Sequence, residues 1–569
     1  MTAPVVDAFG PFIDSGVLTR GDVLLAARLG RIVGEDERPA LLATALCLAE
    51  LQRGAVCLVL DAPPPLPDGL AWPTASAWRD VLRRSPLVGA AGSPADRPLR
   101  LDGDRLYLQR YWQDEEMVRQ VMAGRTSALP PPDAAIEAAL DAMFTDPAQQ
   151  PSPEQRQAAR VAARSRVTLL AGGPGTGKTW TVAHVLGVLA EIRGGDLRVA
   201  VAAPTGKAAT RLQEAIANER PSAAPAWIGE LRPSTLHRLL RRRPGPHEVF
   251  RYNRDNPLPH DVVIVDEMSM VSLPLMARLL EAVGNETQLI LVGDPDQLAS
   301  VEAGAVFGDL VRLAAGQAEL VRLRENHRFT GQLQTLAEAI RAGDAAAAVA
   351  ALDAGGNVTF IESHDGSAAF SAVRADAIEQ AQRLQASATA GDADGALGAM
   401  ERFRVLCAHR EGHHGVARWS RLIDEWGAQA TGRRRDGNDW YLGRPLMVTR
   451  NDYDAGVFNG ETGVVIHAGD RDVAVIDQGG TRPLFAPTQL QDVETLHAMT
   501  VHKAQGSQYH HVTVVLPPPD SPLLTRELLY TAVTRARQSV RIVGTHEAVR
   551  VAVGRSVRRA SGLSARREA

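Results

Sequence analysis

The segment GGPGTGKT, at residues 172–179, limits the folds open to this chain more than any other feature of its sequence. It fits the pattern G-x-x-x-x-G-K-[ST], follows the apolar stretch VTLLA and precedes the helix-like stretch WTVAHVLGVLA. In that setting a glycine-rich loop brings backbone N–H groups to phosphate oxygens, and the helix that follows adds its N-terminal dipole. We therefore predict a nucleotide site in which Lys178 reaches the β- and γ-phosphates and the Thr179 hydroxyl ligates Mg²⁺. The loop itself consists of Gly172, Gly173, Pro174, Gly175, Thr176 and Gly177.

Two other strand-like stretches end in polar residues that suit phosphoryl transfer. In DVVIVDEMSM, at 261–270, an apolar run is followed by Asp266 and Glu267. We expect Asp266 to hold Mg²⁺, directly or through water, and Glu267 to orient and polarise the attacking water. LILVGDPDQLASV, at 289–301, supplies Gln297, which we expect to sense the γ-phosphate. The alternative for this last stretch is a turn with a solvated glutamine.

From about residue 155 the chain alternates short apolar strands with helices, which is typical of a parallel sheet. We predict one α/β domain at 154–335 and a second at 336–569. Short strands separated by NGETG, GDRD and DQGG indicate a small SH3-like β-barrel inserted into the second domain at about 440–490. Prolines around Tyr252-Asn253 favour a hairpin at 244–258 that projects from the first domain and helps to part a duplex.

The region before these domains has a different pattern. Residues 1–125 carry apolar residues at helical spacing and are predicted to form a helical domain, with a hairpin around Asp102-Gly103. Residues 126–153 are predicted to be a linker, because they include the Pro- and Gln-rich stretch DPAQQPSPEQ.

Composition restricts the class of protein further. The formal net charge of −4 excludes a globally basic nucleic-acid binder, although it leaves room for a local basic groove. No apolar run approaches the 18 residues of a membrane span, and the N-terminus lacks the pattern of a signal peptide. The three cysteines, Cys47, Cys57 and Cys407, are far apart and odd in number. We therefore predict reduced thiols in a cytoplasmic protein that has no membrane partner.

Several polar and basic segments offer contacts to phosphate groups. APTGKAATRL, at 203–212, opens a helix with Thr205 and Lys207 after a predicted strand. STLHRLLRRR, at 234–243, adds Thr235 and His237; a helix with a solvated basic face is the equally weighted alternative. Arg328 in RENHRF and Arg535 in YTAVTRARQ suit an arginine that reaches a γ-phosphate across a cleft, although each alone is compatible with a surface arginine.

The order of these motifs, completed by GDPDQLASVEAGAVFGD and TVHKAQGSQY, resembles superfamily 1 helicases. Within them it resembles the RecD family, the alpha subunits of exodeoxyribonuclease V (RecBCD). The motifs cover about residues 155–545, and the N-terminal resemblance is weaker. The resemblance implies two RecA-like P-loop domains, ATP and Mg²⁺ as cofactors, and 5′-to-3′ movement along single-stranded DNA. It also implies action on duplex DNA ends in recombinational repair, within a heterotrimer with RecB-like and RecC-like subunits that the N-terminal domain helps to dock.

The resemblance also assigns roles to residues that carry no sharp chemistry alone. Gln155 matches a glutamine that reads adenine, and the segment TVHKAQGSQY, at 500–509, is placed in the cleft between the two domains, facing both DNA and nucleotide. Gly506, with Gln505, lies towards the γ-phosphate. The remaining implied DNA contacts are Asn459, Thr500, His502, Gln505 and Ser507, in addition to Thr205, Lys207, Thr235 and His237.

One stretch departs from the family pattern, and two other functions stay open. CAHREGHHGVARW, at 407–419, carries His413 and His414 where a Gly/Pro-type loop is expected; their spacing does not match a zinc site. No nuclease carboxylate cluster is evident, so a nuclease is expected in a partner subunit. The alternatives are a stand-alone RecD-like or conjugative helicase, and an ATP-controlled regulatory scaffold without translocation. Stimulation of ATP turnover by DNA separates the scaffold from the helicases.

Overall fold

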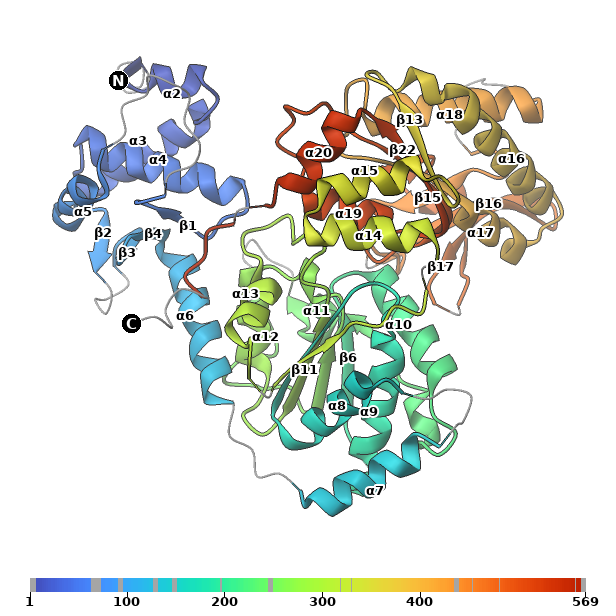
Figure 1. The fold of residues 1–569 in the computed structure, drawn as a ribbon, viewed down its shortest axis with the longest axis horizontal. Coiled ribbons are helices and arrows are strands. Elements are labelled where there is room, and N and C mark those ends of the chain that lie inside the picture. The colour runs from blue at the N-terminus through green and yellow to red at the C-terminus, as the bar shows by residue number, and fades with distance from the viewer. Residues whose placement is uncertain are drawn as a thin grey trace.

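The computed structural model describes residues 7–62, 73–90, 96–125, 131–145, 151–194, 197–243, 249–317, 319–328, 330–433, 440–452, 454–479, 481–557 and 559–563. Figure 1 shows three parts: an N-terminal unit, a first α/β unit around β6 (Val199–Ala203) and β11 (Gln288–Gly293), and a second α/β unit around β13 (Val358–Glu362) and β22 (Ala536–Gly544). Among the described residues, no helix is both long and apolar enough to cross a membrane.

The N-terminal unit combines helices with a small sheet, so the expectation of a helical domain is only partly correct. Its four strands pair in the order β1-β4-β3-β2, and β3 and β4 form the expected hairpin after Asp102. Apolar side chains such as Leu99 and Leu106 alternate into the core beneath the helices. The elements are α2 (Gly10–Asp14), α3 (Arg20–Val33), α4 (Arg38–Gln52), β1 (Cys57–Val59), α5 (Ala75–Arg84), β2 (Val88–Ala90), β3 (Leu99–Asp102), β4 (Arg105–Leu108) and α6 (Gln109–Gly124).

The predicted linker contains a helix, α7 (Asp133–Met143). Its sequence DAAIEAALDAM spaces Ile136, Leu140 and Met143 on one face, which packs against α9 of the first α/β unit. Composition alone hid this helix, because the Pro- and Gln-rich residues that flank it dominate the segment. Residues 126–130 and 146–150 lie outside the described part of the chain.

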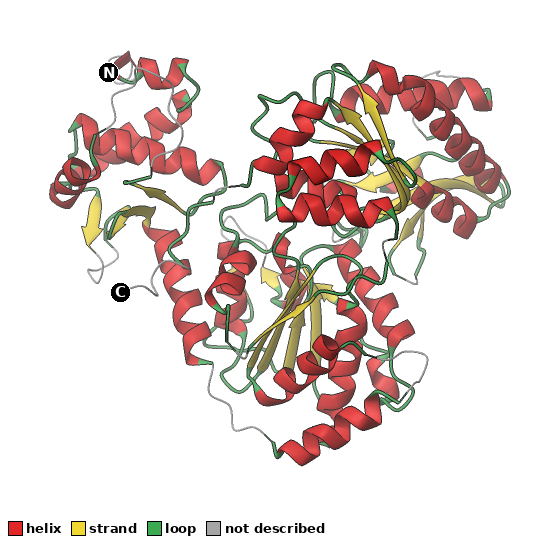
Figure 2. Ribbon diagram, in the orientation of Figure 1, coloured by secondary structure: helices red, strands yellow, loops and turns green. Residues whose placement is uncertain are grey.

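The first α/β unit is a six-stranded parallel sheet in the order β12-β5-β11-β10-β6-β7, with helices on both faces (Figure 2). The central strands are buried along their whole length, as both-sided coverage requires. The elements are α8 (Pro153–Arg164), β5 (Val167–Gly172), α9 (Lys178–Arg193), β6 (Val199–Ala203), α10 (Gly206–Glu219), β7 (Ser234–Thr235), α11 (Leu236–Leu239), β10 (Val262–Val265), α12 (Leu273–Ala282), β11 (Gln288–Gly293), α13 (Val306–Leu313) and β12 (Leu320–Leu323).

The predicted hairpin at 244–258 coincides only in part with a two-stranded pairing. Strand β8 (Arg242–Arg243) pairs antiparallel with β9 (Val249–Phe250), and residues 244–248 between them lie outside the described residues. The paired segment therefore begins two residues earlier than predicted.

The second α/β unit is a five-stranded parallel sheet in the order β13-β22-β21-β14-β20. Two parallel α/β sheets were predicted, and both are present. Its elements are α14 (Gln332–Ala342), α15 (Ala345–Asp353), β13 (Val358–Glu362), α16 (Phe370–Thr389), α17 (Ala393–Arg402), β14 (Phe403–Cys407), α18 (Val416–Thr431), β20 (Ala498–Thr500), β21 (Tyr509–Val515), α19 (Arg526–Val533), β22 (Ala536–Gly544) and α20 (His546–Gly554).

An antiparallel sheet interrupts the second unit where the barrel was expected. Its strand order is β18-β17-β16-β15-β19, and the pairings of the described residues do not join β18 to β19. We call it the inserted sheet. Its strands are β15 (Pro445–Val448), β16 (Thr462–Ala468), β17 (Arg471–Asp477), β18 (Leu484–Phe485) and β19 (Val493–Thr495).

The segment after α20 returns to the N-terminal unit, as the red trace in Figure 1 shows. The Val56 N–H donates to the Ala560 carbonyl at 2.8 Å, and the Gly562 N–H donates to the Glu115 carboxylate at 2.9 Å. On its way, Arg559 donates to the carbonyls of Ser300 and Gly304 in the first α/β unit. This segment, residues 559–563, therefore joins all three units.

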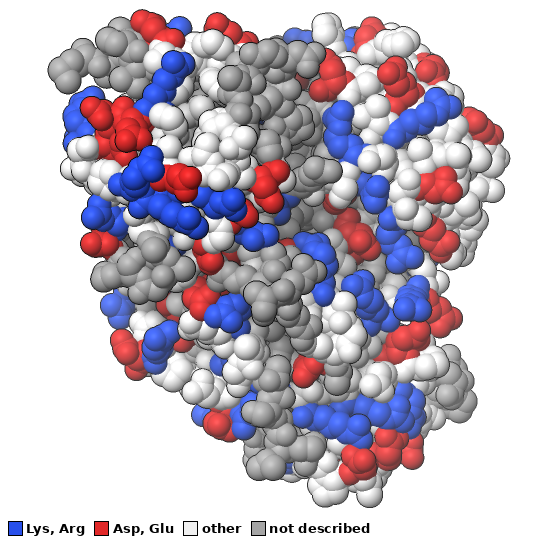
Figure 3. Space-filling model, turned by 60° about the vertical axis from the view of Figure 1, so that its left-hand side comes forward, with Lys and Arg blue, Asp and Glu red and all other residues white. Residues whose placement is uncertain are grey.

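Charged side chains of both signs are interspersed on the face that Figure 3 shows. The formal net charge of −4 is thus not gathered in one acidic area of that face. Any electrostatic attraction of an anionic polymer must come from a local groove.

Candidate nucleotide and nucleic-acid sites

The loop at 172–179 joins the end of β5 to the start of α9. Gly175 and Gly177 have φ values of 85° and 76°, a conformation that side chains other than glycine's rarely adopt. Lys178 Nζ donates to the carbonyls of Gly172 and Gly173 at 2.8 and 3.0 Å, which keeps its ammonium against the loop. The free N–H groups at the start of α9 and this ammonium make a site for phosphate groups.

Gln155 lies directly beside this loop. Its Oε1 accepts the Ser152 N–H at 2.8 Å, in a capping box at the start of α8. A Cβ placed on Gly177 would come within 2.6 Å of Gln155 Nε2, so the amide occupies the space over that glycine. The structure thus brings Gln155 to the nucleotide loop, as the resemblance implies.

Two carboxylates, the half-buried Asp266 and the buried Asp294, follow the neighbouring strands β10 and β11 at the same edge of the sheet. Burial, and next the charge of Glu267, raise the pKa of Asp266 to about 6, while Lys178 opposes this shift. Burial also raises the pKa of Asp294, after β11, to about 6. Glu267 has a φ of 52°, a strained backbone conformation of the kind that gathers at functional sites. Close acidic groups that are costly to ionise alone suit a divalent cation, so Asp266 and Thr179 fit Mg²⁺.

Asp294 was not predicted as a site residue. The available signal was the same as for Asp266, a carboxylate immediately after a buried strand of the sheet. The prediction for the stretch GDPDQ named only Gln297 and left out Asp294.

Gln297 connects this edge to the second α/β unit. Its Nε2 donates to Asp294 Oδ2 at 2.9 Å, and its Oε1 accepts from Arg535 Nη2 at 3.2 Å. Arg535 also donates to the carbonyls of Thr531 and Ser507 at 3.1 and 3.3 Å, and only 2% of the residue is exposed. Burial lowers the pKa of Arg535 from its usual value. A buried arginine from one unit thereby reaches the Gln297 loop of the other and lines the same cavity as the phosphate loop.

Arg328 approaches from the loop after β12, in the first α/β unit. Asn326 Nδ2 donates to the Pro174 carbonyl at 2.8 Å, and the Arg328 N–H donates back to Asn326. Desolvation within the cleft, and next the charge of Arg535, lower the pKa of Arg328 to about 10. The two predicted arginines therefore converge on one place from opposite sides.

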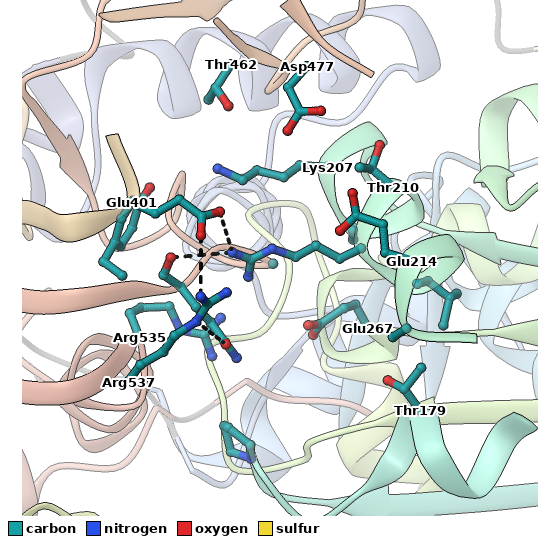
Figure 4. A pocket seen from close by; sticks show the side chains of 18 of the residues that line it. Thr179, Lys207, Thr210, Glu214, Glu267, Glu401, Thr462, Asp477, Arg535 and Arg537 are labelled. Carbon is teal, nitrogen blue, oxygen red and sulfur yellow. Dashed lines mark hydrogen bonds and ion pairs between the residues drawn. The ribbon is translucent and has the colours of Figure 1, made fainter. Parts of the chain in front are cut away.

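These groups line a cavity of about 690 Å³ between the two α/β units, which is large enough for a nucleotide. Figure 4 shows Thr179 and Glu267 on one side and Arg535, Arg537 and Glu401 on the other. The predicted residues in its lining are Pro174, Gly175, Gly177, Lys178, Thr179, Lys207, Asp266, Glu267, Gln297, Arg328, Gly506 and Arg535. Glu401, which was not predicted, lies 3.7 Å from Arg211 of the first unit and 3.4 Å from Arg537 of the second.

A second hollow, of about 650 Å³, lies between the first α/β unit and the inserted sheet. We call it the basic groove. Thr235 and His237, two of the residues expected to contact DNA, line it together with Arg238 from the same basic stretch and with Phe458, which was not predicted. The Arg238 guanidinium lies 4.6 Å from the centre of the Phe458 ring, so a cation and an aromatic face meet across the two units. Gly206, Arg241, Arg242, Gly456, Gln478 and Thr481 complete much of its wall.

Other residues expected to contact DNA lie near this groove but outside its lining. The Thr205 hydroxyl accepts the Ala208 N–H and caps α10, whose first residue, Gly206, is in the groove. Asn459 is exposed next to Phe458. Lys207 faces the nucleotide cavity instead, 5.8 Å from the Tyr509 ring, and burial lowers its pKa.

The segment 500–509 has two parts: Gln505 and Ser507 lie on the nucleotide side, and Thr500 and His502 lie at and just after the end of β20. Gln505 and Ser507 are buried on the nucleotide side: Gln505 Nε2 donates to the Leu298 carbonyl at 2.7 Å, and the Ser507 carbonyl accepts from Arg535. Because these side chains are enclosed by the contact between the α/β units, they do not face the basic groove as DNA contacts. Thr500 ends β20 and caps the turn at Lys503, and burial lowers the pKa of the half-buried His502.

Comparisons with known proteins agree with this arrangement. Residues 150–363 match the AAA domain family, and residues 495–543 match the UvrD-like helicase C-terminal domain. Together with a nucleotide cavity between two parallel α/β sheets, these matches define a P-loop helicase. Residues 14–107 match the N-terminal domain of the RecBCD enzyme subunit RecD.

Full-length relatives narrow the class. The RecBCD enzyme subunit RecD of Mycolicibacterium smegmatis is 47% identical, over 97% of this chain and 97% of that protein. The protein of the same name from Mycobacterium tuberculosis (strain CDC 1551 / Oshkosh) is 46% identical, over 98% and 96%. This chain belongs to the RecD family. A solved Bacteroides Pif1 helicase in complex with ADP-AlF3 and single-stranded DNA is 16% identical, with a TM-score of 0.37 over 70% of this chain and 94% of that one.

Proposed function

We propose that this protein is an ATP-dependent DNA helicase that moves 5′ to 3′ and serves as the motor subunit of a RecBCD-type complex at double-strand DNA ends. One observation carries the proposal. The nucleotide cavity takes its phosphate loop and carboxylates from one α/β unit and Arg535 from the other. Binding and hydrolysis at such a site change the distance between the units, which is what translocation requires.

The predicted residues at and beside the cavity have proposed parts in hydrolysis. Lys178 binds the β- and γ-phosphates, while Thr179 and Asp266 hold Mg²⁺, which neutralises phosphate charge when bound. Glu267 orients the attacking water, and Gln297 reports the γ-phosphate to Arg535, with which it shares a hydrogen bond. Arg328 and Arg535 stabilise the charge that develops on the transferred group. Gln155 contacts the adenine from its place beside Gly177.

The basic groove is proposed to hold single-stranded DNA. Arginines and helix starts suit backbone phosphates, and Phe458 offers a ring face on which a base can stack. Such contacts tolerate any sequence, and their affinity falls with salt. The groove has walls from the first α/β unit and from the inserted sheet, so a strand in it would be gripped by parts that move relative to one another. We further propose that the inserted sheet closes as the small barrel expected from the sequence.

The N-terminal unit is proposed to dock onto a RecC-like or RecB-like partner, because the relatives bear the name of a RecBCD subunit. On α3, Leu24, Leu25 and Ile32 are 41%, 47% and 67% exposed, an apolar face of the kind that protein interfaces cover. The nuclease of the complex is proposed to lie in a partner, and a cytoplasmic location accords with work on chromosomal DNA.

The test compares ATP hydrolysis with and without single-stranded DNA, and unwinding of duplexes with 5′ or 3′ tails, for the chain alone and co-expressed with RecB-like and RecC-like subunits. We expect DNA to stimulate hydrolysis and 5′ tails to be preferred. Activity that rises on adding the partners supports the subunit role. Hydrolysis indifferent to DNA would refute the motor, and full unwinding without partners would favour a stand-alone helicase.

A further inference from the structure

Tyr530 extends from α19 of the second α/β unit to the phosphate loop of the first. The residue is only 4% exposed. A Cβ placed on Gly173 would lie 2.9 Å from the Tyr530 hydroxyl oxygen, and among the described residues beyond its chain neighbours it would meet nothing else within 4 Å. The hydroxyl therefore packs against Gly173, and a methyl group at this position would force one of the two to shift.

Burial, and next the charge of Asp294, raise the pKa of the same hydroxyl, so the Asp294 carboxylate lies close to it. Asp294 is 1% exposed and accepts from Gln297 Nε2, at 2.9 Å, and from the Asp296 N–H, at 3.1 Å. A buried carboxylate needs such donors, because ionisation away from water is costly. Both donors come from its own loop, whereas Tyr530 belongs to the other α/β unit.

The contact at Gly173 reaches the group that binds phosphate. The Gly173 carbonyl accepts from Lys178 Nζ at 3.0 Å and from the Thr176 hydroxyl at 2.9 Å. Next to Tyr530, the Thr531 hydroxyl accepts the Leu298 N–H at 2.8 Å. Two consecutive residues of α19 thus hold both the phosphate loop and the loop that carries Gln297.

We infer that Tyr530 is a positioning residue for ATP hydrolysis: when α19 docks, its hydroxyl holds the phosphate loop at Gly173 while the adjacent Thr531 holds the Gln297 loop. It does not touch the reacting atoms; it acts through Gly173. Docking of the second unit then aligns the site in addition to supplying Arg535. This inference rests on the proposed ATPase function.

A double-mutant cycle tests the contact. Gly173→Ala puts a methyl group against the hydroxyl, and Tyr530→Phe removes the oxygen that it meets. Gly172→Ala is the matched control, because its Cβ would meet the Thr176 hydroxyl at 2.5 Å and Leu323 at 3.1 Å, and not Tyr530. For the wild type, the three single variants and the two double variants, steady-state ATP hydrolysis with saturating single-stranded DNA is measured together with urea-induced unfolding.

We expect Tyr530→Phe to lower kcat about tenfold with the KM for ATP changed less than about twofold, as for an interaction that acts in the transition state. We also expect Tyr530→Phe to restore much of the stability lost in Gly173→Ala, and none of that lost in Gly172→Ala. A wild-type kcat in Tyr530→Phe, or equal rescue of both glycine variants, would overturn the inference. A wild-type chain without ATPase activity would instead refute the proposed function, while the unfolding data would still show whether the contact exists.

Discussion

Replacing Arg535 by alanine separates the catalytic from the structural work of one buried side chain. The Arg535 side chain makes four hydrogen bonds, to Gln297 Oε1, to the carbonyls of Ser507 and Thr531, and to the Thr534 hydroxyl, at 3.1–3.5 Å. Losing the donor to a buried acceptor such as Gln297 Oε1 costs about 1–3 kcal/mol of folding stability. An arginine that stabilises the transition state of phosphoryl transfer contributes a factor of about 10³–10⁵, or about 4–7 kcal/mol of barrier.

These two effects can be measured apart. We expect Arg535→Ala to keep its fold at 25 °C and to bind a fluorescent ATP analogue within about tenfold of the wild type. Its kcat for DNA-stimulated hydrolysis should fall at least about 10³-fold. Arg535→Lys keeps the positive charge but loses the planar guanidinium that bonds both Gln297 and Ser507. Its kcat should therefore lie between those of Arg535→Ala and the wild type.

Arg537→Ala is the matched control for this series. Arg537 lines the same cavity, but it is exposed and pairs with Glu401 at 3.4 Å, so its loss should lower kcat less than about tenfold. If Arg535→Ala hydrolyses ATP within tenfold of the wild-type rate, Arg535 has no part in the chemistry. A variant that is slow only because it is unfolded would show the same loss in far-UV circular dichroism.

Three further predictions concern other parts of the two sites. Lys178→Ala should abolish ATP turnover with unchanged thermal unfolding; turnover within tenfold of the wild type would contradict its role. Arg238→Ala should weaken binding of single-stranded DNA and reduce the slope of log affinity against log salt by about one, as fluorescence anisotropy at several salt concentrations would show; an unchanged slope would exclude a phosphate contact. The pKa of Asp294 is raised to about 6, above its usual 3.8, so between about pH 4 and 6 the folded state binds more protons there than the unfolded state. Its contribution to the free energy of unfolding should therefore fall by up to about 3 kcal/mol as pH rises through this window, and Asp294→Asn should lack that fall in urea titrations.

The phosphate loop and the parallel sheets were predictable because local sequence determines them. The backbone at positions 175 and 177 is left-handed, which favours glycine there. The buried strands β5, β10 and β11 are continuous apolar runs. The position of Asp266 follows from the same logic, since parallel strands end at one edge of a sheet.

Contacts between distant segments were not predictable in this way. Gln505 and Ser507 carry polar side chains in a glycine-broken loop, which favours an exposed DNA contact, yet the docking of the two α/β units buries them. Nothing near Tyr530 in the sequence indicates that its hydroxyl reaches Gly173, more than 350 residues away. Such contacts depend on how the folded α/β units dock against each other. The hydrophobic periodicity of the sequence predicts the helices and strands within a unit but not this docking.

The segment 559–563 gives the protein a definite order of completion during synthesis. Val56 bonds to Ala560, which the ribosome adds 504 residues later, and at about 5–20 residues per second this takes between about 25 and 100 s. Throughout that time the edge of the N-terminal unit around Val56 and Glu115 lacks its final partner, while the α3 face with Leu24 and Ile32 can already be complete. A partner subunit could therefore bind the N-terminal unit before the motor behind it is finished, and the ATPase would be joined to that unit only after residues 559–563 have been made.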